Sequence, residues 1–237
     1  MTPERVRDGV APRTDARAAL IEAAGRLFAE HGVEVVSLRE ITRAAGQRNT
    51  TALQYHFTNR DGLLREVLGP HLREVGQRRH TLLDQYELAG RADLRELASA
   101  LVLPLVAKLS DPDGGRAYLQ IAAELLGRTG RTLTDDSPAM LVLRDPDRSL
   151  VRWIDLVAPL IPPEAVGPPL HRRMAAIRFA HLELSRRARD APRTDRHPVL
   201  FTHYLVDLVT AVLGAPVSEQ TRRVLAQREA SERGGRT

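Results

Sequence analysis

Apolar residues recur at helical spacing along most of this chain, and the apolar–polar alternation typical of β-strands is scarce. The first periodic segment predicts a helix over residues 15–31, which Gly32 ends. Its inward face is defined by four apolar side chains: Leu20, Ala24, Leu27 and Phe28. Residues 1–13 lack this period and are expected to form a disordered arm. The pattern therefore predicts an all-α protein.

Two short helices are predicted next. Ser37 and Glu40 match a capping box, in which the serine hydroxyl accepts from an amide of the first turn while the glutamate reaches back. Gly46 ends this helix and supplies the turn, because glycine adopts the positive φ that lets a following helix cross the first. The following helix carries Leu53 and Phe57 on its inward side.

The remaining helices are longer and more apolar. One is expected to start around residue 60 and to run to about residue 83, with Pro70 as a kink or an interruption. Glycine and proline separate the others, which are expected at 91–109, 114–128, 137–161 (broken near 145–147), 168–190, 198–213 and 217–231. The chain is therefore divided into an N-terminal three-helix domain, residues 14–60, and a larger helical domain, residues 61–237.

The two short helices and their turn form a helix-turn-helix. The start of its second helix presents hydroxyls and an amide, which suit a helix lying in the major groove of DNA. The candidate DNA contacts there are Asn49, Thr50, Thr51, Gln54, Tyr55 and His56. Placed to reach phosphates beside them are Arg39, Arg43, Arg48 and Arg60. A solvated helix start, or packing of Tyr55 and His56, would fit the same residues.

The N-terminal part of the chain resembles the tetracycline-repressor (TetR) family. The segments that carry the resemblance are AAGRLFAEHG at 23–32, SLREITRAAG at 37–46 and LQYHFTNRDGLL at 53–64. Two features depart from the family's pattern: one extra residue lies within 47–49, and Arg60 stands where the family usually has lysine. The resemblance covers about residues 14–68 and implies a transcriptional regulator that binds a palindromic operator as a homodimer.

In that family the C-terminal helices form a ligand pocket and a dimer interface. Two apolar stripes here have the spacing of a four-helix bundle between subunits, although such stripes also suit a chain's own core. The stripes are Leu170, Met174, Ile177, His181 and Leu184, and Phe201, Leu205, Leu208 and Val212. The leading hypothesis is a repressor that releases its operator when a small, largely apolar effector binds. The alternative is a dimeric DNA-binding regulator without a ligand.

The composition argues against a membrane protein, a metal-binding protein and an enzyme. No apolar run reaches the roughly 18 residues of a membrane helix, and no signal-like segment opens the chain, so we expect a cytoplasmic protein without a membrane partner. The chain has no cysteine and no i, i+4 histidine pair, so no metal or other cofactor is expected. An all-helical enzyme is disfavoured because a Gly-rich phosphate loop and a Ser/His/Asp arrangement are both missing.

Overall fold

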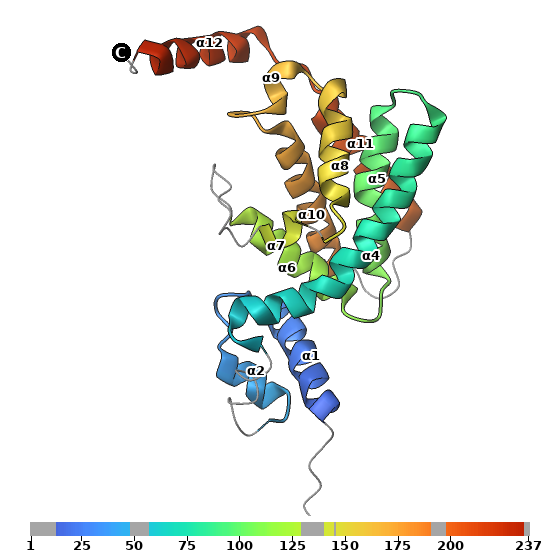
Figure 1. Cartoon of the computed structure of the whole chain (residues 1–237), viewed down its shortest axis with the longest axis vertical. Helices are drawn as coiled ribbons and strands as arrows, with labels where there is room; N and C mark the ends of the chain where they lie inside the picture. The colour runs from blue at the N-terminus through green and yellow to red at the C-terminus, as the bar shows by residue number, and fades with distance from the viewer. Residues whose placement is uncertain (1–12, 48–56, 129–139, 145, 191–197, 235–237) are drawn as a thin grey trace, which may run out of the picture.

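The N-terminal helices form a small bundle at one end of the molecule (Figure 1). The computed structural model describes residues 13–47, 57–128, 140–144, 146–190 and 198–234, and no strand occurs among them. The helices at this end are α1 (Arg13–His31), α2 (Leu38–Ala44) and the start of α4 (Arg60–Ala89). We call the described residues up to residue 67 the head, and the described residues from 68 onward the body. The predicted all-α class is confirmed.

A single long helix joins the head to the body. The helix α4 continues through Pro70 without the interruption that this proline suggested, and it ends at Gly90, whose φ is +63°. Near its start, Val67 lies 3.5 Å from the Cβ position of Gly25, so α1 and α4 approach closely there. The predicted domain boundary, between residues 60 and 61, lies in the first turn of this helix.

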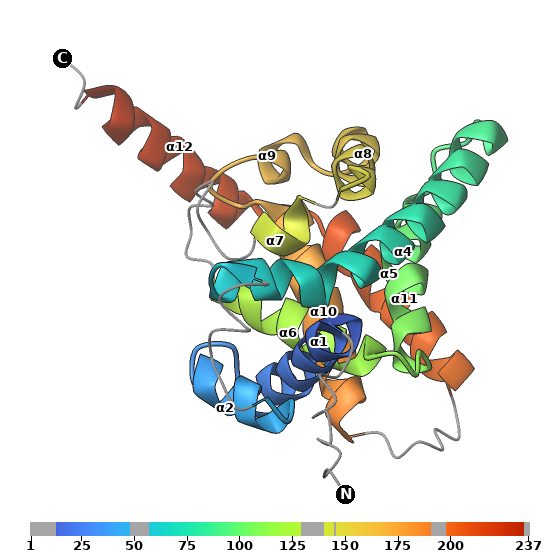
Figure 2. The ribbon, with the colours of Figure 1, turned by 60° about the horizontal axis from the view of Figure 1, so that its bottom comes forward.

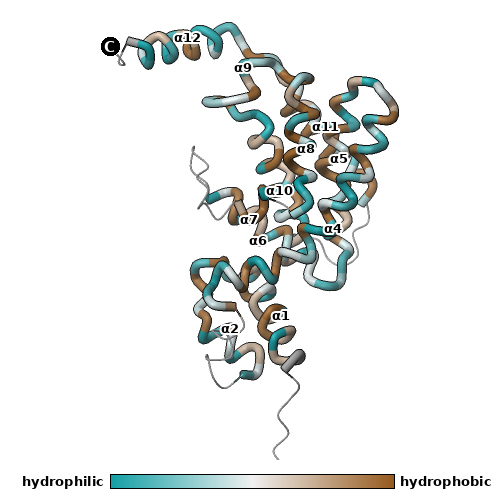
Figure 3. Tube along the Cα trace, viewed as in Figure 1, coloured by the Kyte–Doolittle hydropathy of each residue, from teal (hydrophilic) through white to brown (hydrophobic). Residues whose placement is uncertain are grey.

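The body is built around one central helix. Four helical elements lie together here, with the last of them in contact with the other three: α5 (Leu94–Val106), α6 (Gly115–Gly127), α11 (Pro198–Gly214) and α10 (Arg172–Asp190). A short 3₁₀ helix, η1 (Ala107–Leu109), extends α5. Apolar positions alternate with hydrophilic ones along these helices, which is typical of a bundle with one buried face per helix (Figure 3).

Short elements cover one side of the body: α7 (Met140–Leu143), α8 (Ser149–Val157), η2 (Ala158–Leu160) and α9 (Pro163–Val166). They replace the single broken helix expected over 137–161. The side chain of Trp153 is fully buried, and its Nε1 donates to the Leu97 carbonyl at 2.7 Å. The next helix, α10, begins at Arg172 rather than at 168, because His171 has a positive φ of +44°, which lies outside the right-handed helical region.

The last helix, α12 (Glu219–Gly234), leaves the body on its own (Figures 1 and 2). Its described side chains are almost all exposed. Ion pairs one turn apart, such as Arg223 with Glu219 at 3.2 Å, support it locally. In the described part of the chain no single helix is long and apolar enough to cross a membrane, although α11 and α12 together, across a 51° bend, meet the length and composition criteria.

Candidate nucleic-acid interface

The first helix of the motif is fixed by local hydrogen bonds. The Ser37 hydroxyl accepts from the Glu40 amide at 3.2 Å, and the Glu40 carboxylate accepts from the Ser37 amide at 2.7 Å, so the predicted capping box is present. The hydrogen bond from the Ser37 backbone is the main cause that holds the pKa of Glu40 below its usual range. The end of the helix is set equally locally, because Gly46 has the positive φ, +70°, that the turn requires.

A small apolar core holds α2 against its neighbours. Ile41 of α2 is fully buried with Phe28 of α1 and Phe57, while Leu38 packs against them half-buried. Phe28 and Phe57, both predicted to face inward, are buried, and Leu53 lies outside the described residues. This packing leaves Arg39 and Arg43 exposed on the outer side of α2.

Most of the predicted base-reading residues lie outside the described part of the chain. These residues are Arg48, Asn49, Thr50, Thr51, Gln54, Tyr55 and His56, and their roles stay predictions. Of the predicted phosphate contacts, Arg39 is described and exposed.

Arg60 is turned partly inward. It is the first residue of α4, behind the N-cap Asn59, whose side chain accepts from the Gly62 amide at 2.8 Å. A Cβ at Gly62 would lie 2.2 Å from the Phe57 carbonyl oxygen, so only glycine fits this tight start. The Arg60 guanidinium donates to the carbonyl of Val33, in the connection between α1 and α2. Its predicted contact with phosphate is untested, but its role within the head was not foreseen.

The stripes predicted for the dimer interface divide into two groups. Ile177, His181, Leu184 and Leu205 are at most 2% exposed within the single chain, because α10 and α11 turn these faces toward α5 and α6. These four side chains pack inside their own chain, and the dimer interface expected on the two stripes stays a prediction. The half-buried members of the stripes are Leu170, Met174, Phe201, Leu208 and Val212.

The surface of α10 and α11 carries other large apolar side chains. Leu182 on α10 and Val199, Leu200 and Tyr204 on α11 are each more than half exposed. The end of α10 meets the start of α11, where the Arg187 guanidinium lies over the Phe201 ring, 4.6 Å from its centroid. The two helices therefore present apolar groups that the described chain leaves uncovered.

A cavity of about 540 Å³ lies where η1 and the start of α6 face the C-terminal end of α10 and the N-terminal end of α11. Apolar side chains, including Val106, Leu109 and Phe201, line it together with three charged ones, Asp111, Arg116 and Arg187. The volume is within the usual range for small-molecule sites. The lining is more polar than the apolar pocket expected from composition.

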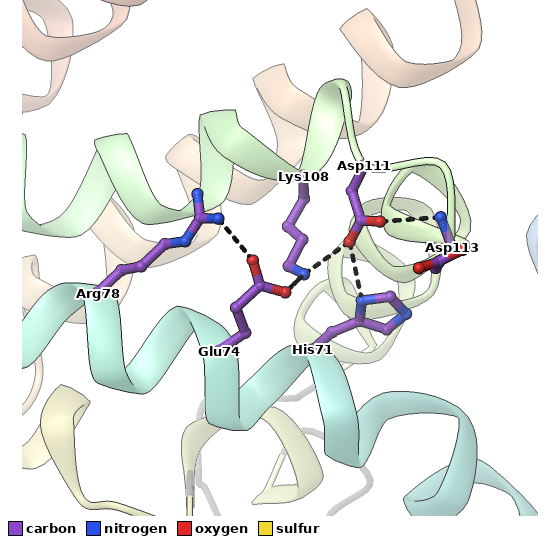
Figure 4. Close-up of polar contacts among 6 residues, drawn as sticks. All are labelled: His71, Glu74, Arg78, Lys108, Asp111 and Asp113. Atoms are coloured by element: carbon purple, nitrogen blue, oxygen red, sulfur yellow. Dashed lines mark hydrogen bonds and ion pairs between the residues drawn. The ribbon is translucent and has the colours of Figure 1, made fainter.

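A buried polar cluster connects this cavity to α4 (Figure 4). The Lys108 ammonium is 1% exposed and donates to the Glu74 carboxylate and, at 2.7 Å, to Asp111 Oδ2. His71 Nδ1 lies 3.6 Å from the same oxygen. Burial lowers the pKa of His71, while the hydrogen bonds from Lys108 and Asp113 lower the pKa of Asp111 in spite of its burial. Glu74 and His71 belong to α4, so Asp111 couples a cavity wall to the helix that carries the head.

The sequence held a sign of this cluster that its analysis missed. Lys108 is the only lysine in a chain with 35 lysine and arginine residues, and it follows a long apolar run. Lysine is rarely buried without a carboxylate partner. An isolated lysine among leucines and valines therefore indicates a buried ion pair.

The fold and the site define a class: a helical, DNA-binding transcriptional regulator with an N-terminal helix-turn-helix head. Residues 20–67 match the family model described as bacterial regulatory proteins, tetR family. The matched segment has the sequence of this family's N-terminal domain, and members of the family are transcriptional regulators rather than enzymes. None of the curated proteins matches the chain significantly.

Several solved structures are similar to this chain, and the first of those named here shares its fold. AmtR of Mycobacterium smegmatis is 20% identical and aligns over 96% of this chain and 98% of its own, with a TM-score of 0.51. NalD, the secondary repressor of the MexAB-OprM multidrug efflux pump in Pseudomonas aeruginosa, is 22% identical over 86% of this chain and all of its own, with a TM-score of 0.47. PfmR of Thermus thermophilus is 16% identical over 84% of this chain and 99% of its own, with a TM-score of 0.47.

Proposed function

We propose that this protein is a homodimeric repressor that acts in the cytoplasm, binds a palindromic operator and releases it when a small, largely apolar molecule binds the body. The observation that carries the proposal is the single uninterrupted helix α4, which begins in the head and contacts the cavity-side cluster within the body. A displacement of this helix changes the position of the head.

Operator binding is assigned to the outer side of the head. One head contacts only a few base pairs, so specificity requires two heads whose separation follows the helical repeat of DNA. The proposed contacts are Arg39, Arg48, Asn49, Thr50, Thr51, Gln54, Tyr55, His56 and Arg60. The capped α2 and the turn at Gly46 support this assignment, because they orient the chain that leads into the second helix of the motif.

The dimer interface is assigned to the exposed faces of α10 and α11. Leu182, Leu200 and Tyr204, each more than half exposed, are proposed as its apolar centre. Burying such side chains favours association by about 25 cal/mol for each Å² of apolar surface removed from water. Leu200→Glu should therefore yield monomers in light scattering, whereas Val224→Glu on α12 should not. A stable wild-type monomer at micromolar concentration would contradict the dimer.

Effector binding is assigned to the cavity beside Asp111. Its apolar walls suit a largely apolar body, and its charged residues suit one polar group on that molecule. Preferential binding to the DNA-incompetent state, with a coupling of about 1–3 kcal/mol, would weaken operator affinity roughly 5- to 150-fold. The test is a metabolite screen read by melting temperature and operator affinity, with Leu109→Glu, a cavity-lining residue outside the predicted interface stripes, as the blocked variant. If no compound shifts either quantity, the alternative of a dimeric regulator without a ligand is favoured.

A further inference from the structure

The connection between α1 and α2 is held by a side chain from the body. The Val33 amide donates to both carboxylate oxygens of Glu124 on α6, at 3.1 Å each. Val33 is 2% exposed, so its N–H has little access to water. The two residues are 91 positions apart in the chain. This hydrogen bond is therefore a direct polar tie between the head and the body, separate from the covalent connection through α4.

The carboxylate of Glu124 is itself held in place. Arg128, the C-cap residue of α6, donates to Glu124 Oε1 at 3.1 Å and lies 3.5 Å from Glu34. A hydrogen bond to an ionised acceptor is stronger than one between neutral groups. The arginine thus adds a charge-assisted contact to the carboxylate that accepts from Val33.

The same residue of the connection is held from the other side. The Val33 carbonyl accepts from Arg60, the first residue of α4, just after the helix-turn-helix. Both main-chain polar groups of Val33 are therefore engaged, one by the body and one by the head's supporting helix. An apolar contact between helices tolerates sliding, but a hydrogen bond is directional and fixes rotation.

We infer that Glu124 is a positioning residue for operator recognition: through Val33 and Arg60 it fixes the orientation of the head on the body. In a dimer the orientation of each head determines the separation of the two reading helices, and hence the half-site spacing that the protein accepts. The effect on half-site spacing rests on the proposed dimeric function. The hydrogen bond between Val33 and Glu124 does not depend on it.

The tie is tested first without DNA, by hydrogen exchange of the full chain. Glu124→Ala removes the acceptor and should raise the exchange rate of the Val33 amide about tenfold or more, while amides in the core of α5 keep their rates. Glu124→Gln retains one acceptor oxygen and should give an intermediate rate. The matched control is Glu219→Ala, which breaks a Glu–Arg pair of the same spacing on the exposed α12. Unchanged exchange at Val33 in Glu124→Ala would overturn the inference.

The consequence for recognition is tested with operators selected by the wild-type protein and rebuilt with one base pair added or removed between the half-sites. Wild type should discriminate against the altered spacings, and Glu124→Ala should reduce this discrimination about tenfold, since a loosened head adapts to other separations. Affinity for a single half-site should stay within about twofold. A variant that melts earlier but keeps the wild-type spacing ratio would show a purely structural role and overturn the inference.

The two proposals fail in different ways. If wild type selects no bipartite site, the dimeric function is wrong, and the exchange of Val33 alone decides whether Glu124 ties the head to the body. If wild type discriminates between spacings and Glu124→Ala discriminates equally, only the positioning role of Glu124 is wrong.

Discussion

The head and the body both bury apolar helix faces, but the head does so with residues near in sequence and the body with residues far apart. The head closes a small core with residues that are near in sequence, such as Phe28, Ile41 and Phe57, and its helix ends are set by a serine cap and a glycine turn. The body brings together helices that are distant in sequence and buries polar groups among them, including Lys108 and His181. Local signals thus build the described part of the head, while long-range packing builds the body.

The buried polar groups of the body explain why the body should be more sensitive than the head to small displacements of its helices. A buried polar or ionised group is stable only while its partners remain in place. Lys108 needs Glu74 and Asp111, and Arg79 donates to Ser149 at 2.9 Å in the interior. Small displacements in the body therefore have large energetic consequences, which suits a region proposed to respond to a ligand. The head, with an apolar core, is expected to move as one unit.

The largest expected effect is a loss of stability when the core of the body is disrupted. Trp153→Ala removes a fully buried side chain and leaves the Leu97 carbonyl without its indole donor, so unfolding should become easier by about 3–5 kcal/mol. Denaturant unfolding followed by circular dichroism measures this. Val224→Ala, on the exposed face of α12, is the control and should change stability little. A loss below about 1 kcal/mol for the tryptophan would mean that the body does not depend on this packing.

The second effect concerns pH and separates a body histidine from a head histidine. Burial lowers the pKa of His181 to about 4 from 6.5, and the nearby charge of Arg79 adds to this. As the pH falls below 6.5 the unfolded chain binds a proton that the folded chain does not, so stability is present above that pH and is lost toward pH 4. The loss should be roughly 3 kcal/mol.

This pH effect is measured by denaturant unfolding of wild type and His181→Leu at a series of pH values. The variant should lose the part of the acid dependence that the histidine causes. His31→Gln, an exposed position at the end of α1, should keep it. Identical pH profiles for wild type and His181→Leu would show that the ring is not buried in its neutral form.

The third effect is a loss of DNA affinity caused by substitutions in the head. Gln54→Ala should cost about 1–3 kcal/mol of operator binding and relax preference at one symmetric base position, because an amide pairs bidentately with adenine. Arg39→Ala should weaken all sequences alike and reduce the salt slope of binding by about one per subunit. Arg39 is preferred over Arg60 here, since Arg60 also holds Val33.

Affinities for operator and scrambled DNA over a salt series check the third effect. Neither substitution should change the oligomeric state or the unfolding of the body. If Gln54→Ala weakened both DNAs equally while Arg39→Ala altered base preference, the reading face would be rotated, and the extra residue within 47–49 would be the cause.

The smallest effect tests the local signals themselves. Ser37→Ala removes the N-cap of α2 and should cost about 1 kcal/mol of stability in the head. Ser218→Ala removes the corresponding hydrogen bond, which the Thr221 amide donates to the Ser218 hydroxyl at 3.2 Å, from the start of α12. Only the first substitution should weaken operator binding. An equal loss of binding from both would contradict the assignment of the reading surface to the head.

The sequence alone determined the helical class, the bounds of α1 and α2, and the position of the motif. Each depends on interactions within a few residues, such as the Ser37–Glu40 box or the positive φ of Gly46, and such interactions are visible in a linear pattern. The bounds of α6 and α11 also followed within a residue or two, because glycine or proline lies at or near their ends.

Only the tertiary structure decided what each helix face contacts. Periodicity identified the stripe of Ile177, Leu184 and Leu205 but not its partner, and packing against the chain's own helices placed it in the core. The tie between Val33 and Glu124 was equally invisible, because a main-chain N–H has no sequence signature and the carboxylate that accepts from it lies 91 residues away. A linear pattern records which residues share a face, but the pairing of faces is set by the fold as a whole.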